Sequence, residues 1–178
     1  PLSWKLDRSV ADSITFKGFG AKYKPSEVSG LNRLYYDRNE AFTKRIPFFD
    51  HYVPDITIEK PKAYIIPQSW ARVIELLKIN GVKLEPLAKD ISMEVEAYYI
   101  EDYKSPAKPY EGHYIHTGVV LRKEKQTLPF YKGDYIIYTN QPSNRYIIET
   151  LEPQGPDSFF AWNFFDSVLG QKEHFSAY

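Results

Sequence analysis

The chain contains no cysteine, and this one absence excludes several kinds of chemistry. Without thiols there can be no disulfide, no thiolate zinc site and no cysteine nucleophile. Net charge is also missing, because 23 Lys and Arg balance 23 Asp and Glu. A balanced chain has no overall field that attracts nucleic acid or an anionic membrane, so we expect neither as a partner.

The sequence also lacks any apolar run that approaches the roughly 20 residues of a membrane span, and it shows no signal peptide. It begins at Pro1 rather than at a Met, and it ends inside an aromatic tract. These two features favour a fragment of a longer protein. The compartment stays open, because a start at Pro1 is compatible with a signal that was upstream and was removed.

Aromatic residues are abundant, with 15 Tyr, 11 Phe and 3 Trp. Tyr suits half-buried pleated surfaces and wet interfaces, so its frequency favours a β-rich fold. The densest tract covers residues 151–178 and contains Phe159, Phe160, Trp162, Phe164, Phe165, Phe175 and Tyr178. We expect this tract to pack on a core, with Asn163 and Asp166 as local hydrogen-bonding partners.

One segment has the periodicity of a helix. Trp70, Val73, Ile74 and Leu77 form a single apolar stripe, and Asn80-Gly81 is a typical helix end. The spacing predicts a helix over about 68–79, with Trp70 packed in the core. Residues 63–66, just before it, have the composition of a buried strand.

Residues 91–99 alternate between apolar and polar side chains, as a strand of an antiparallel sheet does. Segments 114–121, 135–139 and 146–149 continue this pattern, and a short helix is predicted over about 157–168. We therefore predict an α+β, mainly β fold: an antiparallel β-sandwich-like domain with one prominent helix and a short C-terminal helix. Prolines spaced through residues 1–60 favour an extended β-arm that packs on the main body, residues 61–178.

The metal-binding candidates are Glu111, His113 and His116. On a strand, His113 and His116 would point to opposite faces, and a catalytic zinc needs three protein ligands. This group is therefore a weak metal site, and an independent hydrolase built on it is the least favoured of three hypotheses. The sequence also contains no H-x-x-E pair, G-x-S-x-G elbow or glycine-rich phosphate loop. We predict no catalytic residue, no metal ligand and no cofactor in this chain, although a Ser-His-Asp arrangement stays open.

A second hypothesis is a β-module that binds carbohydrate or peptide through exposed aromatic side chains. The candidate residues for such a surface are Trp4, Tyr98, Tyr103 and Tyr110. Its motivation is the Tyr-rich composition together with the strand pattern.

The leading hypothesis comes from a resemblance. Three segments carry it first: residues 61–67 with Trp70 and 80–82, residues 109–114, and residues 133–135 with Gln141. These segments resemble the region after the catalytic domain of bacterial zinc carboxypeptidase-like proteins. Residues 151–153, 157–160, 162–166 and 171–176 resemble the same region, and this tail is the most specific part. The family is of the carboxypeptidase A-like class and is typical of Bacteroidetes.

In that family the metal ligands, the general base and the substrate-binding Arg lie upstream, in a separate domain. The resemblance therefore implies a non-catalytic C-terminal accessory domain that supports or shapes an upstream peptidase domain of the same polypeptide. It also implies zinc in the catalytic domain of the parent protein and a periplasmic or extracellular location.

Overall fold

A computed structural model describes residues 1–170 and divides the chain into two units. One unit is Trp4–Val53, and the other consists of Pro1–Ser3 and the chain from Pro54 onward. That the N-terminal segment packs on the main body stays a prediction. The described residues do not include His174 or two aromatic residues of the C-terminal tract, Phe175 and Tyr178.

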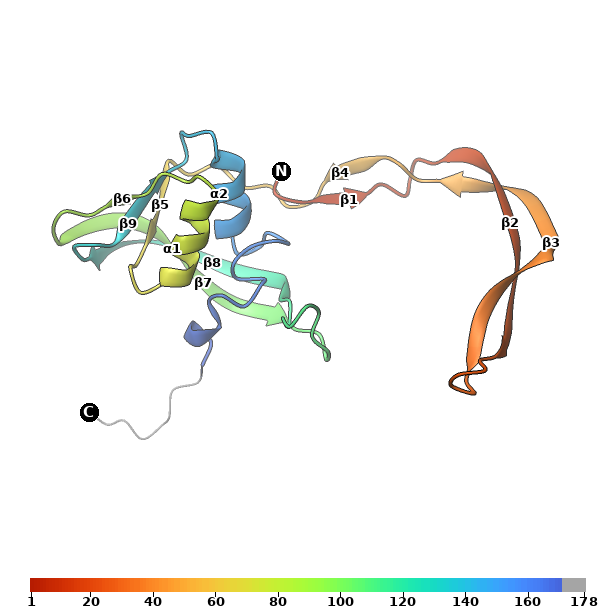
Figure 1. Cartoon of the computed structure of the whole chain (residues 1–178). Coiled ribbons are helices and arrows are strands. Elements are labelled where there is room, and N and C mark those ends of the chain that lie inside the picture. Colours follow the sequence, from red (N-terminus) through yellow and green to blue (C-terminus); the bar gives the residue numbers. More distant parts are fainter. Residues whose placement is uncertain (171–178) are drawn as a thin grey trace. The chain divides into compact units, whose positions relative to one another are not determined.

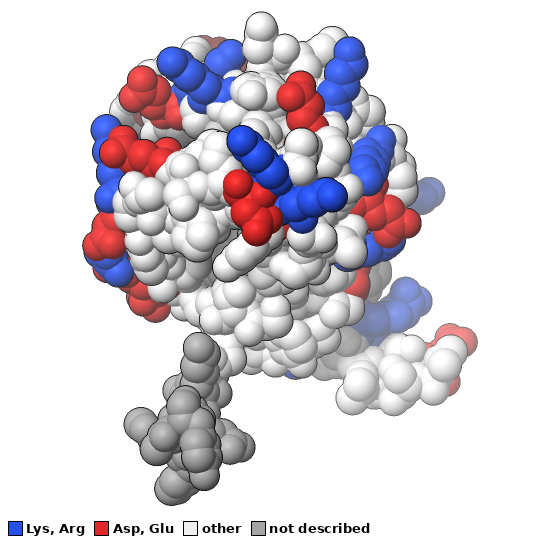
Figure 2. Space-filling model, turned by 90° about the vertical axis from the view of Figure 1, so that its left-hand side faces the viewer, with Lys and Arg blue, Asp and Glu red and all other residues white. Residues whose placement is uncertain are grey.

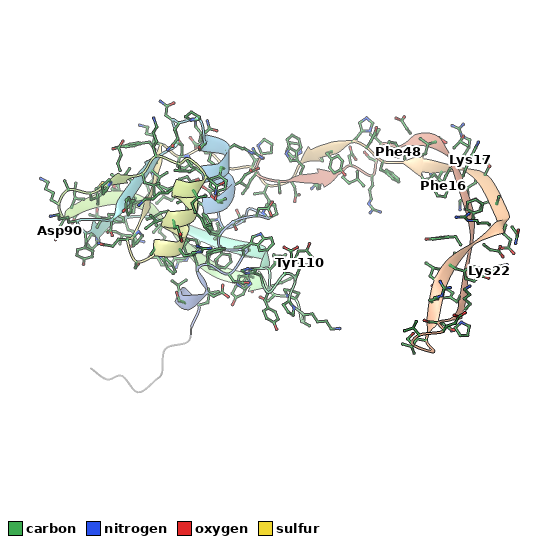
Figure 3. All side chains as sticks on the ribbon, viewed as in Figure 1. Phe16, Lys17, Lys22, Phe48, Asp90 and Tyr110 are labelled. Atoms are coloured by element: carbon green, nitrogen blue, oxygen red, sulfur yellow. The ribbon has the colours of Figure 1, made fainter. Side chains whose placement is uncertain are left out.

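The first unit is built on a long two-stranded ribbon, in which β2 (Asp12–Pro25) pairs antiparallel with β3 (Asn32–Phe48) (Figure 1). The register shifts between Phe19 and Gly20. Beside this irregularity, the Lys22 ammonium contacts the carboxylates of Asp37 at 2.9 Å and Glu40 at 2.5 Å. A two-stranded ribbon cannot bury both of its faces, and Phe16, labelled in Figure 3, is among its exposed aromatic residues. The short strands β1 (Trp4–Leu6) and β4 (Tyr52–Pro54) pair next to the ribbon.

The second unit contains a three-stranded sheet and a long hairpin. The sheet has the order β5-β9-β6, and β5 (Ala63–Ile66) and β6 (Glu85–Pro86) are both antiparallel to the central β9 (Tyr135–Tyr138). The hairpin pairs β7 (Ile91–Lys104) with β8 (Thr117–Phe130). Helices α1 (Ala71–Ile79) and α2 (Asn144–Leu151) and the 3-10 turn η1 (Asp166–Val168) complete the unit.

The hydrophobic core forms where the helices meet the sheet. Val73, Ile74 and Leu77 of α1 are buried together with Ile137 of β9 and Ile147 of α2. The predicted core role of Trp70 is confirmed, since its ring packs against this cluster and meets the Phe165 ring edge-on at 4.8 Å. Phe159 and Phe160 of the aromatic tract are also buried, as predicted.

The predicted fold class, α+β with mainly antiparallel strands, is confirmed. The sandwich-like arrangement is not, because the described residues form one small sheet, two two-stranded ribbons and one short strand pair. The prominent helix begins at Ala71, somewhat later than expected, and ends at Ile79 as expected. Residues 63–66 form the strand that was predicted.

Two predictions about local structure are wrong. Residues 146–149 form part of α2 rather than a strand, because Ile147, Thr150 and Leu151 recur with helical spacing and pack Ile147 into the core. The predicted helix over 157–168 is a series of turns that ends in η1. A positive φ of 67° at Asn163 interrupts that segment, and such a conformation does not continue a right-handed helix.

Candidate functional site

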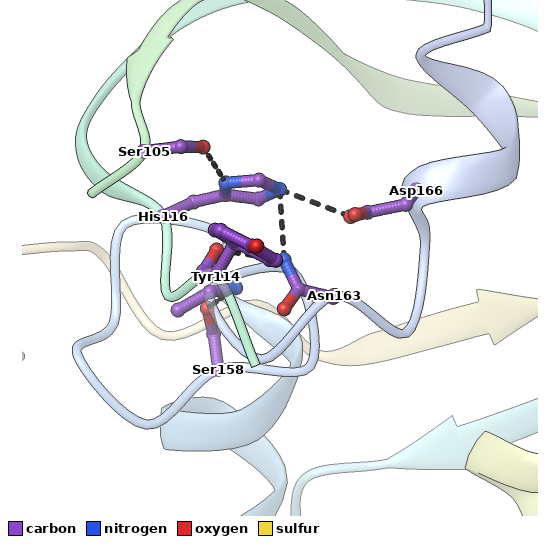
Figure 4. Close-up of polar contacts among 7 residues, drawn as sticks. Ser105, Tyr114, His116, Ser158, Asn163 and Asp166 are labelled. Carbon is purple, nitrogen blue, oxygen red and sulfur yellow. Dashed lines mark hydrogen bonds and ion pairs between the residues drawn. The ribbon is translucent and has the colours of Figure 1, made fainter. Parts of the chain in front are cut away.

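The most connected group of polar side chains surrounds His116, which is 6% exposed. We call Ser105, His116, Asn163 and Asp166 the His116 cluster (Figure 4). Ser105 Oγ lies 2.7 Å from His116 Nδ1, and Asp166 Oδ1 lies 3.0 Å from Nε2. Asn163 Nδ2 lies 3.1 Å from the same Nε2. The cluster joins the end of the β7–β8 hairpin to the C-terminal turns.

The local chain path explains how these residues meet. Ser105 directly follows β7, and His116 directly precedes β8, so the hairpin brings the two together. The turns after α2 return to this end of the hairpin, where the His116 amide donates to the Ala161 carbonyl at 2.9 Å. The Asn163 side chain donates to the Tyr114 carbonyl at 2.9 Å. Both bonds fasten the aromatic tract to the hairpin.

The partners of His116 make opposite demands on its Nε2 atom. A carboxylate is an acceptor only, so a hydrogen bond to Asp166 requires a proton on Nε2. In the neutral ring, Nδ1 then accepts from the hydroxyl of Ser105. Asn163 Nδ2 is a donor, and it can donate to Nε2 only when that atom has lost its proton. Asn163 and Asp166 therefore favour opposite tautomers of the same ring.

A hydroxyl, an imidazole and a carboxylate in series are the parts of a serine hydrolase relay. In the His116 cluster, however, the imidazole and the Asn163 side chain also hold the fold. The His116 ring is covered by the rings of Tyr103 at 4.4 Å and Phe160 at 5.1 Å between centroids. Asn163 is bound to the backbone of Tyr114. We therefore interpret the cluster as a structural clamp.

The three metal-binding candidates do not converge. His113 packs against the rings of Trp162 and Phe164, whereas His116 belongs to its own cluster. Glu111 lies in the turn between β7 and β8 with a positive φ of 49°. The strand predicted over 114–121 is present from Thr117 onward as β8, so His113 and His116 precede it and the strand geometry expected for this pair does not apply. Within residues 1–170, no three His, Cys, Asp or Glu side chains gather as metal ligands would.

The four aromatic candidates lie in different settings. Trp4 is 53% exposed in the first unit, and Tyr110 is 61% exposed in the turn beyond β7 (Figure 3). Tyr103 contacts His116 and Phe160. The Tyr98 hydroxyl donates a hydrogen bond to the Glu152 carboxylate. That any of them binds a ligand stays a prediction.

Sequence reasoning missed a second polar group, which surrounds Glu152. Glu152 is only 1% exposed, and its Oε1 accepts hydrogen bonds from the hydroxyls of Tyr64 at 2.6 Å and Tyr98 at 3.1 Å. Burial, and then the nearby Glu152 carboxylate, raise the pKa of both tyrosines above its ordinary value. The three residues come from β5, β7 and the end of α2, so no sequence motif could reveal them.

That nucleic acid is not a partner of this chain stays a prediction. Lys and Arg alternate with Asp and Glu over the face in Figure 2, without a continuous basic stripe on that face. None of the helices within residues 1–170 combines the length and apolarity that crossing a membrane requires.

Comparison with known proteins connects the chain to carboxypeptidases. It is 31% identical over 106 residues to carboxypeptidase 2 of Trichophyton rubrum, covering 60% of this chain and 20% of that protein. Carboxypeptidase 2 of Trichophyton tonsurans is 31% identical over 104 residues, covering 58% and 19%. A probable carboxypeptidase 2 of Arthroderma benhamiae is 28% identical over 102 residues, covering 57% and 19%.

The matched segment thus spans about a fifth of the length of these fungal proteins. No family model matches the chain, and no solved structure matches it. The predicted relation to carboxypeptidases is supported by these relatives. The finer prediction of a bacterial, Bacteroidetes-type group has no such support, because the relatives named above are fungal.

Proposed function

We propose that this chain is a non-catalytic accessory domain of a larger, zinc carboxypeptidase-like protein. The observation that carries the proposal is the similarity to proteins named carboxypeptidase 2 over only about a fifth of their length. A segment of that size within a peptidase-related polypeptide is a domain-sized part. Its own described residues contain the structural clamp and core of a folded unit.

The proposed role is to support or shape the upstream peptidase domain, which would be its partner within the same polypeptide. Zinc would then be held by that domain, and its chemistry there would be to activate water and polarise the peptide carbonyl. A periplasmic or secreted location and a Bacteroidetes-type parent are parts of the same proposal, and they rest on the resemblance of the aromatic tail.

The sequence of the parent protein tests this proposal first. We expect an H-x-x-E pair with a distant third His upstream of this domain, as zinc carboxypeptidase-like proteins have. A parent without that pattern would remove the peptidase link. Deletion of this domain from the parent should then lower the yield of folded protein or raise the KM for peptides, while the zinc content per folded molecule is retained.

The carbohydrate- or peptide-binding module stays as a second proposal, independent of the first. It is tested by a glycan array and by peptide titration of the purified chain. Signals at background in both would remove it.

A further inference from the structure

The second unit contains a cavity of about 610 Å³ between the sheet and the hairpin. Its walls include every residue from Pro61 to Pro67 and every residue from Met93 to Tyr98. When the face of a strand lines a cavity, only alternate residues contribute, because successive side chains point to opposite sides. Two unbroken runs indicate that the backbone edges of β5 and β7 line this cavity.

Within residues 1–170, the edge of β5 that faces away from β9 has unpaired backbone groups. The Thr139 amide donates to the Lys62 carbonyl at 3.0 Å, and residues 63–66 continue this antiparallel register with β9. In such a ladder, bonded and non-bonded pairs alternate. Ala63 and Ile65 therefore direct their N–H and C=O groups away from β9. Among residues 1–170, β9 is the only strand that pairs with β5.

The opposite wall has the same property. β7 pairs with β8 alone among the described residues, so its other edge is open, and β5 and β7 belong to separate sheets. Apolar side chains line the space between them, among them Val95, Leu128 and Ile136. Two open strand edges along one apolar cavity form a slot for an added strand.

We propose that this cavity binds an extended peptide that adds to β5 as an edge strand. Backbone N–H and C=O groups that alternate at strand spacing are matched by another polypeptide backbone, and main-chain pairing supplies affinity in this mode of recognition. The prolines at 61 and 67 bracket the edge and limit pairing to about the length of β5. Apolar side chains at alternate positions of the peptide fill the cavity.

One charge of the walls bears on the ends of the peptide. Glu94, Glu96 and Lys62 line the cavity, and the Glu96 carboxylate is ion-paired with Lys123 at 3.6 Å. The Glu94 carboxylate can pair with a basic residue near an end of the peptide, so a peptide with basic ends fits better than an acidic one. The inference does not depend on the proposed function, because it uses only the geometry of the second unit.

The test uses the full 178-residue chain and a fluorescein-labelled peptide, acetyl-Lys-Val-Ser-Val-Ser-Val-Lys-amide. A matched peptide has N-methyl groups at alternate amides, which remove backbone donors and keep every side chain. We expect saturable binding of the first peptide and at least about tenfold weaker binding of the second, a difference of about 1.4 kcal/mol. Hydrogen exchange of the Ala63 and Ile65 amides should slow when the first peptide is added.

Two variants test whether the binding site lies on β5. Ala63→Pro removes the outward N–H of residue 63 without removing a bond to β9, and it should weaken binding at least about tenfold. Ala63→Val keeps the N–H and should bind as the unmodified chain does. Circular dichroism checks that both variants fold. If the Pro variant does not fold, the N-methylated peptide and hydrogen exchange still test whether the peptide pairs with β5.

Three outcomes would overturn the inference. Equal binding of both peptides would mean that the cavity captures apolar side chains without strand pairing. Protection of the Ala63 and Ile65 amides that rises with chain concentration alone, together with dimers in sedimentation, would mean that a second copy occupies the edge. Absence of saturable binding up to millimolar peptide would mean that the cavity does not take a peptide of this chemistry.

Discussion

The hydroxyl of Tyr64 lies 2.6 Å from Oε1 of Glu152, although the two residues are 88 positions apart in the sequence. The contact connects the edge strand β5 to the end of α2, and it gives a buried carboxylate one of its two tyrosine donors. A buried charge without hydrogen bonds is costly, so this contact is central to the stability of the second unit.

Replacing Tyr64 by Phe should lower the free energy of unfolding by about 2 kcal/mol. The reason is that a hydrogen bond to a charged group contributes about 1.5–3 kcal/mol, and its loss leaves the Glu152 carboxylate with one donor fewer. Tyr98→Phe is the matched control and should cost less, since its bond of 3.1 Å is longer. Urea unfolding followed by Trp fluorescence measures both. Equal stability of Tyr64→Phe and the unmodified chain would show that the contact is unimportant.

The same pair predicts a pH dependence. Burial and Glu152 raise the pKa of Tyr64 above its ordinary value of 10.0. The unfolded chain therefore loses this proton first, and the stabilisation is fully present below about pH 10 and is lost as the pH rises further. The free energy of unfolding should fall more steeply between about pH 9 and 11 for the unmodified chain than for Tyr64→Phe. Parallel curves for the two proteins would contradict this explanation.

The His116 cluster should contribute to stability rather than to hydrolysis. His116→Ala removes a buried ring together with its contacts to Ser105 and Asp166, so we expect a loss of about 2 kcal/mol or more. Asp166→Asn should cost less than about 1 kcal/mol, because the carboxylate is 46% exposed and water competes for its hydrogen bond to His116. Thermal unfolding measures both variants, and a p-nitrophenyl acetate assay of Ser105→Ala should match the buffer-corrected rate of the unmodified chain. A clear loss of esterase rate in Ser105→Ala would instead support a working relay.

Helix α1 offers a test of the core. Leu77 is fully buried, so Leu77→Ala should cost about 2–5 kcal/mol through the lost contacts and the cavity that remains. Ile79 lies in the same helix but is 71% exposed, so Ile79→Ala should change stability by less than about 0.5 kcal/mol. Chemical unfolding of the two variants provides the comparison. Similar losses in both would mean that α1 does not bury the face assigned to it.

Secondary structure could be predicted from the sequence where the local pattern and the tertiary packing agree. The apolar stripe of Val73, Ile74 and Leu77 predicted α1, and the alternation after Ile91 predicted β7. Asn163 and Asp166 were expected to form hydrogen bonds, and they do, but with His116 rather than with neighbours in the chain.

The prediction of a strand was wrong for a short segment whose pattern fits both the strand period and the helix period. Residues 146–149 contain apolar and polar side chains that suit a strand as well as a helix, and packing of Ile147 on the core decided for the helix. The polar groups around His116 and Glu152 could not be predicted, because their members come from distant segments. Only the fold brings Ser105 to His116 and Tyr64 to Glu152.

The most direct test of the proposed function compares this chain with its parent protein in a carboxypeptidase assay. Both are purified, supplied with zinc and assayed with a C-terminally unblocked peptide, and bound zinc is measured by mass spectrometry. We expect turnover and stoichiometric zinc for the parent, and neither for this chain alone. Turnover by this chain that is lost on chelation or in His113→Ala and His116→Ala would contradict it.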